Sequence, residues 1–458
     1  MTVSNSPAPV SADPGPGRAR ALAGISLGYF MVLLDMTVLS VAEPDLASSL
    51  DTSMAGLQWA TTGYTVAFAA LLLSSGAAAD HFGAERLFRA GIAVFTLASL
   101  LTAFAPGLSV LVLLRAISGV AAAACVPASM AMIAQLYPEP ATRARAVSAW
   151  AAISGAAVAA GPIAGGALVG AAGWRSVFLV NVPIGLVVLA LTLGRAVDCP
   201  RGERRIDWPA QFAAAAVLAL FTDALIAAGS QAWAHAAWSS VGLGVSVLAF
   251  CGLERRSQAP VLNRALLRSG RVRAGLLAAA AVNFALTGGL FVLPLLLQQE
   301  WHLGPLQTGL AFLPLTIPFA ANPPFTGRIV ARMGPRRPIL AGLVLLAAGG
   351  AVLAGAVFAN QSYPWLAVGL LMTGFGVSYA LPALVVALVS VAPAGTAGAV
   401  GGLLNAVRQV GATLGVVVMG AAVAAGIGWA LLVSAAVCAI AWFVFAFARR
   451  EETTGVTA

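Results

Sequence analysis

A single carboxylate interrupts an apolar stretch near the start of the sequence. Asp35 is the one ionisable side chain between Phe30 and Ala42. A charge placed in hydrocarbon costs several kcal/mol, so such a group is rarely retained without a use. A carboxyl group can bind and release a proton, and it can pair with a cation. We therefore predict that Asp35 is a site of proton exchange and substrate coupling.

A buried cation in another apolar stretch lies at the same predicted depth. With a rise of ~1.5 Å per helical residue, Asp35 and Arg115 both lie roughly 10 Å from the same membrane face. Burial together with an opposite charge can tune a carboxyl group towards proton exchange. The alternative is a permanent ion pair that only orients two helices. We favour proton exchange, because ionisable groups inside membranes usually mark transport pathways.

A second intramembrane arginine has no acidic partner in its own half of the sequence. Arg408 lies near the middle of an apolar stretch with Asn405 and Gln409, and the apolar stretches after residue 274 contain no acid. A buried arginine without a counter-ion should face a wet cavity or bind carbonyls or an anion. Cavity lining and structural hydrogen bonding are both open interpretations. Further cavity candidates are Thr37, Gln58 and Tyr64.

The composition defines the class of protein that must position these groups. Hydrophobic residues make up 60% of the 458 residues and charged residues only 9%, against ~25% charged in soluble domains. The net charge of +9 consists of arginines in short connectors, which argues against a nucleic-acid partner. The four cysteines lack metal-ligand spacing, so we expect neither a disulfide framework nor a zinc site. We also predict no cofactor.

Hydropathy predicts an all-α polytopic membrane protein with fourteen transmembrane helices, embedded in the lipid bilayer. The predicted spans are 22–42, 56–78, 88–105, 108–135, 146–170, 176–194, 209–228, 235–253, 274–298, 306–326, 338–358, 364–388, 397–420 and 426–447. Arg175 is the one arginine in a predicted outer connector, which places both termini in the cytoplasm by the positive-inside rule. Acids instead occupy the outer connectors, with Glu43, Asp45 and Asp51 after the first span.

An internal repeat divides the spans into two six-helix bundles. The connector Gly76-x4-His81-x-Gly83-x2-Arg86 has the same spacing as Gly327-x4-Arg332-x-Gly334-x2-Arg337. Spans seven and eight have no counterpart and are predicted to be an inserted pair. The predicted organisation is a disordered cytoplasmic tail at 1–19, an N-terminal bundle at 20–195, a linker with the inserted helices at 196–256, a basic amphipathic cytoplasmic connector at 257–273, a C-terminal bundle at 274–448 and a tail at 449–458.

Several motifs resemble those of one transporter family over nearly the whole length. Residues 34–44, LDMTVLSVAEP, resemble the signature L-D-x-T-x-V-N-V-A-L-P, and residues 174–183, WRSVFLVNVP, resemble W-R-W-x-F-x-x-N-x-P. The chain thus looks like a major facilitator superfamily transporter of the fourteen-helix drug:proton antiporter branch. Two further matches are a loop motif at Gly76, Asp80, Gly83 and Arg86, and G-P-x-x-G-G at Gly161, Pro162, Gly165 and Gly166.

The resemblance implies roles for these motifs. The loop motif would act as a gate on the cytoplasmic side, favouring one of two arrangements of the bundles. The G-P-x-x-G-G motif would close one end of the pathway against proton leak, an interaction that is physically the same as close packing of small residues. The chain departs from the pattern at His81, at Ala84 and Glu85, at Ser118 in place of glutamine and at Ser40 in place of asparagine.

The sequence therefore predicts a proton-coupled antiporter rather than an enzyme. It would export hydrophobic drugs, antibiotics or an endogenous secondary metabolite across the bacterial cytoplasmic membrane, as a functional monomer with protons as the coupling ion. A proton symporter importing a small organic solute on the same fold is the alternative, against which the Gly161-Pro162 motif argues. A membrane-embedded enzyme is a third possibility, but no metal cluster or nucleophile–base pair is apparent.

Overall fold

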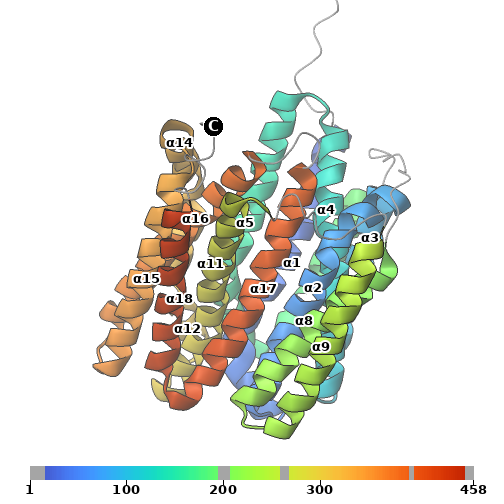
Figure 1. The fold of residues 1–458 in the computed structure, drawn as a ribbon. Coiled ribbons are helices and arrows are strands. Elements are labelled where there is room, and N and C mark those ends of the chain that lie inside the picture. Colours follow the sequence, from blue (N-terminus) through green and yellow to red (C-terminus); the bar gives the residue numbers. More distant parts are fainter. Residues whose placement is uncertain (1–15, 194–206, 258–267, 391–396, 449–458) are drawn as a thin grey trace, which may run out of the picture.

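The computed structural model describes residues 16–193, 207–257, 268–390 and 397–448, and all its elements are helices (Figure 1). The first group comprises α1 (Pro16–Ser49), α2 (Met54–Phe82), α3 (Ala84–Ala103), α4 (Leu108–Leu136), α5 (Pro140–Ala172), α6 (Ser176–Leu179) and α7 (Asn181–Thr192). Next come α8 (Trp208–Gly229) and α9 (Trp233–Arg256). The last group comprises α11 (Gly270–Leu295) with the π-turn η1 (Leu296–Glu300), α12 (Pro305–Ala311), α13 (Leu313–Ala321), α14 (Pro323–Met333), α15 (Arg336–Phe358), α16 (Tyr363–Ser390), α17 (Ala397–Ala422), η2 (Val423–Ala425) and α18 (Ile427–Phe447).

Long apolar helices are the expected solution for this composition, because a helix satisfies its backbone hydrogen bonds within the segment. Eleven helices in the described part of the chain are long and apolar enough to cross a membrane, and α2 is a twelfth when its bent halves are counted together. The two other predicted spans, 176–194 and 306–326, correspond to shorter helices, α6 with α7 and α12 with α13. The total of fourteen spans and the orientation of the termini stay predictions.

The helices form two groups that agree with the repeat. Within the first group α1 packs on α5 and α7, and α4 packs on α2 and α3. Within the last group α11 packs on α17 and α18, and α15 packs on α16 and α18. The groups meet where α2 contacts α17, where α5 contacts α12 and α13, and where α1 contacts α11. We call these groups the N-bundle and the C-bundle.

Several contacts between the bundles lie towards the end at which α1 finishes. The Gln298 side-chain amide of η1 donates to the Val41 carbonyl at 2.9 Å. The Gln58 amide of α2 donates to the Val417 carbonyl of α17 at 3.0 Å. We call this end the outer end, after the predicted orientation. The bundles are joined here through side chain to backbone hydrogen bonds as well as by packing.

Helices α8 and α9, the predicted inserted pair, lie along the line where the bundles meet. Helix α8 packs on both α2 and α17, while α9 packs on α8. The Asp223 carboxylate of α8 ties the pair together, because it accepts hydrogen bonds from His235 at 2.8 Å and Ser239 at 2.5 Å. Figure 1 shows the two helices, coloured green, side by side along the bundle. The insertion therefore bridges the two bundles on one side.

One predicted boundary is wrong. Helix α1 runs to Ser49, through Pro44, so Glu43 and Asp45 lie within it rather than in a connector. The helix continues because Ala42 and Leu46 are fully buried and the Asp45 carboxylate accepts a hydrogen bond from the Trp174 backbone at 2.7 Å.

Several predicted segments fall outside the described residues. These are residues 1–15 of the predicted tail, residues 196–206 of the linker, residues 258–267 of the amphipathic connector and the C-terminal tail at 449–458. The last residues of the predicted N-terminal tail, 16–19, belong to α1.

Candidate functional site

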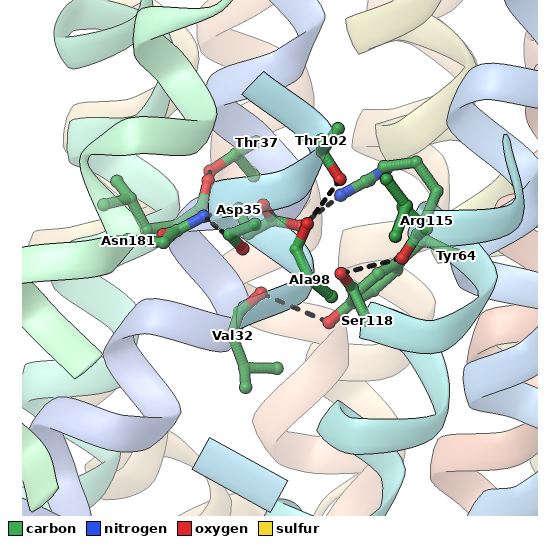
Figure 2. Close-up of polar contacts among 12 residues, drawn as sticks. Val32, Asp35, Thr37, Tyr64, Ala98, Thr102, Arg115, Ser118 and Asn181 are labelled. Atoms are coloured by element: carbon green, nitrogen blue, oxygen red, sulfur yellow. Dashed lines mark hydrogen bonds and ion pairs between the residues drawn. The ribbon is translucent and has the colours of Figure 1, made fainter. Parts of the chain in front are cut away.

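The Asp35 carboxylate lies at the centre of a buried polar cluster in the N-bundle. Its Oδ2 atom accepts a hydrogen bond from the Arg115 guanidinium, and the two side chains form an ion pair. Its Oδ1 atom accepts a hydrogen bond from the Asn181 side-chain amide at 2.9 Å. Figure 2 shows Asp35 between these two partners, which come from α4 and α7. The two charges that were predicted to lie at one depth are therefore in direct contact.

Arg115 is held on several sides. Its Nε atom donates to the Ala60 carbonyl of α2 at 3.4 Å, and its guanidinium carbon lies 4.7 Å from the centre of the Tyr64 ring. The Phe178 ring lies on another side at 5.7 Å. Asp35 is 1% exposed and Arg115 is 2% exposed. A cation over an aromatic face in a desolvated site is stabilised by the ring quadrupole.

Asn181 is a site residue that sequence reasoning did not single out. It begins α7 directly after the break between α6 and α7, which turns its amide towards α1. The amide also donates weakly to Ser99 of α3 at 3.4 Å. The available signal was the asparagine within the stretch at 174–183, whose type alone says nothing about its partner. Asn181 thereby connects α3 and α7 to the carboxylate on α1.

This cluster pairs one buried negative group with one buried positive group. The carboxylate has two donors, and Arg115 has no second carboxylate in contact among the described residues. Apart from Asp35, Arg115 has only a long bond to a carbonyl and its aromatic neighbours. The ion pair and the Asn181 amide therefore connect α1 with α4 and α7.

Helix α1 buries a second carboxyl group, Glu43, which was predicted to lie in a connector. Glu43 is 2% exposed, and its Oε1 atom accepts a hydrogen bond from the Thr61 hydroxyl of α2 at 2.9 Å. Its Oε2 atom is buried and has no hydrogen-bond partner among the described residues. Glu43 lies eight residues beyond Asp35 on α1, which is ~12 Å along the helix.

The G-P-x-x-G-G stretch lies where α5 contacts α1 and the C-bundle. A Cβ atom at Gly161 would overlap the Thr37 hydroxyl of α1, and one at Gly166 would overlap the Pro305 carbonyl of α12. Gly309 of α12 lies in turn against the Pro162 carbonyl. Small residues on both sides let the two backbones approach closely. The motif is therefore a contact between the bundles at the outer end.

The predicted gate loop joins α2 and α3 at the opposite end of these helices. Asp80 and Arg86 are exposed, and Gly83 separates the helices with a φ of 90°, a conformation that favours glycine. Gly76 has open space around its Cα. Gly76 and Asp80 lie within α2 and Arg86 lies within α3, so Gly83 is the single residue between these helices. The predicted loop is therefore much shorter than expected, and the role of these positions in gating stays a prediction.

Helix α2 bends sharply before it reaches this loop, and a side chain of α8 stabilises the bend. The helix bends by 64° between Leu72 and Ser74. Such a break interrupts the helical hydrogen-bond pattern, so carbonyls near it need other donors. The buried Gln211 of α8 supplies one, because its amide donates to the Ala70 carbonyl and its oxygen accepts from the Ser74 hydroxyl. Sequence reasoning gave Gln211 no role.

The candidate cavity residues lie in different environments. Thr37, Gln58 and Tyr64 are buried in helix contacts, with Tyr64 fully enclosed beneath Arg115. The half-buried Arg408 donates to Asn405 at 3.0 Å, and its Nε atom has no partner among the described residues. One narrow cavity, of about 10 Å³, lies between α2, α8 and α17 next to Thr413. It is far smaller than the ~300–1,000 Å³ of a drug-sized pocket.

Comparisons with known proteins agree with this architecture. The sequence matches the Major Facilitator Superfamily over residues 25–253 and 275–457. It is 33% identical to the multidrug resistance protein Stp of Mycobacterium tuberculosis (strain CDC 1551 / Oshkosh), over 88% of this chain and 75% of that protein. It is 32% identical to the methylenomycin A resistance protein of Streptomyces coelicolor, over 92% of this chain and 90% of that protein.

A solved structure shares the fold. The crystal structure of a bacterial homologue of the human lysosomal transporter Spinster, in an inward-facing and unoccupied conformation, superimposes with a TM-score of 0.70 at 18% identity. The alignment covers 95% of this chain and 98% of that one. Together with the match over most of the chain, this makes the protein a multi-pass membrane transporter, not an enzyme, that belongs to the Major Facilitator Superfamily.

Proposed function

We propose that this protein is a proton-coupled antiporter that exports hydrophobic drugs, antibiotics or an endogenous secondary metabolite across the bacterial cytoplasmic membrane. The observation that supports this best is the buried ion pair of Asp35 and Arg115, completed by Asn181. The names of the relatives, which are drug and antibiotic resistance proteins, support export rather than import. A single chain would be the functional unit, with protons as the coupling ion and no cofactor.

The packing of the two bundles suggests how such a cycle would run. The contacts of Gln58 with α17 and of Gly166 with α12 join the bundles at the outer end. Rocking of one bundle against the other would break these contacts and open the outer end, which is the motion expected for alternating access. Asp35 would then exchange its proton with one side of the membrane at a time.

The charges in the membrane interior limit the substrate. Asp35 is paired with Arg115, and α11 to α18 contain no acid apart from Glu300 in η1. A strongly dicationic compound would find few counter-charges, so a neutral, monocationic or anionic hydrophobic compound fits better.

The test compares drug susceptibility and transport at matched expression. Cells and everted membrane vesicles carrying the wild type, Asp35→Asn or Asp51→Asn are assayed with ethidium and with methylenomycin A. Asp51 is exposed, and its positive φ suits asparagine, so this variant is a matched control. We expect the wild type and the control to confer resistance and to release protons from the vesicle lumen in exchange for the compound.

Asp35→Asn is expected to lose this exchange because the carboxyl group that binds the proton is gone. Resistance that survives Asp35→Asn would remove Asp35 from the coupling role. Entry of the compound into cells together with protons would favour the symporter instead.

A further inference from the structure

We propose that Glu43 is a second proton-binding site, and that closure of the outer end requires its protonation. This site differs from Asp35 in position and in environment, because Glu43 lies nearer the outer end and has no cationic partner in contact. The signature that residues 34–44 resemble has leucine at this position, so the carboxyl group is a feature of this sequence.

Burying the charge of the Glu43 carboxylate costs free energy. A carboxylate transferred out of water needs hydrogen bonds to both oxygens or a paired cation. Glu43 has one hydroxyl donor at Oε1 and no partner for Oε2 among the described residues. A neutral carboxylic acid satisfies this environment much better than an anion. The closed arrangement therefore favours Glu43 with its proton bound.

The charged groups on the neighbouring helices are engaged by partners other than Glu43. Arg115 of α4 acts on Glu43 electrostatically, but its guanidinium is engaged by Asp35. Asp45, on the same helix, accepts a hydrogen bond from the Trp174 backbone. Arg175, ahead of α6, lies over the Trp174 ring at 4.3 Å. Arg115 and Arg175 therefore contact other groups in this arrangement, and neither is paired with Glu43.

The remaining neighbours of α1 give Glu43 no counter-charge. Glu300 of η1 is exposed and carries the wrong sign for pairing. The stretches of α2, α5, α7 and α12 that face the outer half of α1 contain no Lys, Arg or His among the described residues. Neutralisation by a proton is the remaining way to bury this carboxyl group.

Glu43 lies beside the contacts between the bundles that must break when the outer end opens. Thr61, its donor, lies one turn from Gln58, whose amide binds the Val417 carbonyl of the C-bundle. Val41, two residues before Glu43, accepts the hydrogen bond from Gln298. Parting the bundles here would admit water to this part of α1. The carboxyl group would then ionise readily, and its anion would oppose closure.

The expected linkage has a definite sign. Because the closed arrangement binds the proton more tightly than the open one, lower pH favours closure and higher pH favours opening of the outer end. One linked proton changes the ratio of closed to open molecules by up to about tenfold per pH unit. The proposed antiport gives this pH dependence its physiological role. The pH dependence itself can be tested without a transported compound.

The test measures the distance between the bundles as a function of pH. Spin labels are attached at Ser49→Cys in the N-bundle and Gln361→Cys in the C-bundle, both exposed at the outer end, after replacement of the native cysteines. Purified protein in lipid nanodiscs is examined by double electron–electron resonance. We expect the short-distance population of the wild type to rise as the pH falls, and that of Glu43→Gln to be high at every pH.

Glu300→Gln, at an exposed carboxyl group of η1, is the matched control, and it should keep the pH-dependent step that Glu43 causes. Thr61→Val is a second variant, which keeps the Glu43 carboxyl group but removes its hydroxyl donor. The pH range over which the distance between the bundles changes should therefore extend to higher pH. The proposal is overturned if Glu43→Gln retains the slope of the wild type, or if Thr61→Val has no effect on the range. Loss of drug transport would not affect this result, since the distances are measured without a substrate.

Discussion

Breaking and then removing the buried ion pair should separate its contribution to stability from its role in coupling. Asp35→Asn leaves the Arg115 guanidinium, 2% exposed, with a 3.4 Å bond to the Ala60 carbonyl and no counter-ion in contact. Arg115→Met leaves the Asp35 carboxylate, 1% exposed, with the Asn181 amide as its donor. Loss of one partner of a buried pair typically costs ~3–5 kcal/mol. We expect each single variant to lose about this much unfolding free energy.

The double variant should recover most of that loss. When both charges are absent, no buried charge is left without a partner, and replacing a whole pair by uncharged groups is often neutral. We therefore expect a coupling free energy of roughly 3 kcal/mol or more between the two positions. The measurement is equilibrium unfolding in mixed micelles, followed by the fluorescence of the ten tryptophans.

Two results would refute this reasoning. Single variants that each cost less than ~1 kcal/mol, or a double variant whose loss equals the sum of the singles, would show that the two charges do not stabilise each other in the folded protein. The second such result concerns transport, whereas the first concerns stability. A stable double variant that still exchanges ethidium for protons would make the pair structural, because the titrating carboxyl group would be absent.

Two further substitutions test contacts elsewhere in the fold. Gly166→Val should lower ethidium export at least tenfold and increase proton leak into vesicles, because the new side chain would meet the Pro305 carbonyl, while Gly170→Val, which faces open space, should have little effect. Gln211→Leu should lower the unfolding free energy by ~1–3 kcal/mol because the Ala70 carbonyl and the Ser74 hydroxyl at the break in α2 lose a buried partner. The exposed Gln299→Leu is its control, and equal stability of the two variants would show that Gln211 does not support the break.

The sequence by itself determined the class of the protein and much of its helical organisation. Long apolar stretches can cross a membrane only as helices or closed barrels, so hydropathy predicted most helices within a few residues. Predicted span 108–135 and α4 (Leu108–Leu136) are an example. The pairing of Asp35 with Arg115 was also predictable, because helical rise fixes depth and only a few ionisable groups share it. The assignment to the superfamily rested on motifs that are contiguous in the sequence.

Only the tertiary structure decided which polar groups meet between distant helices. Asn181 bonds Asp35 across 146 residues, and Gln211 bonds Ala70 across 141. Neither residue type carries information about its partner until packing removes the alternatives. Glu43 shows the same limit, since an acid beside a proline resembles a helix end in the sequence, whereas α1 continues past Pro44 and buries that acid against Thr61. Depth along one helix follows from local geometry, but the face a residue presents and the donor it finds there depend on how all the helices pack.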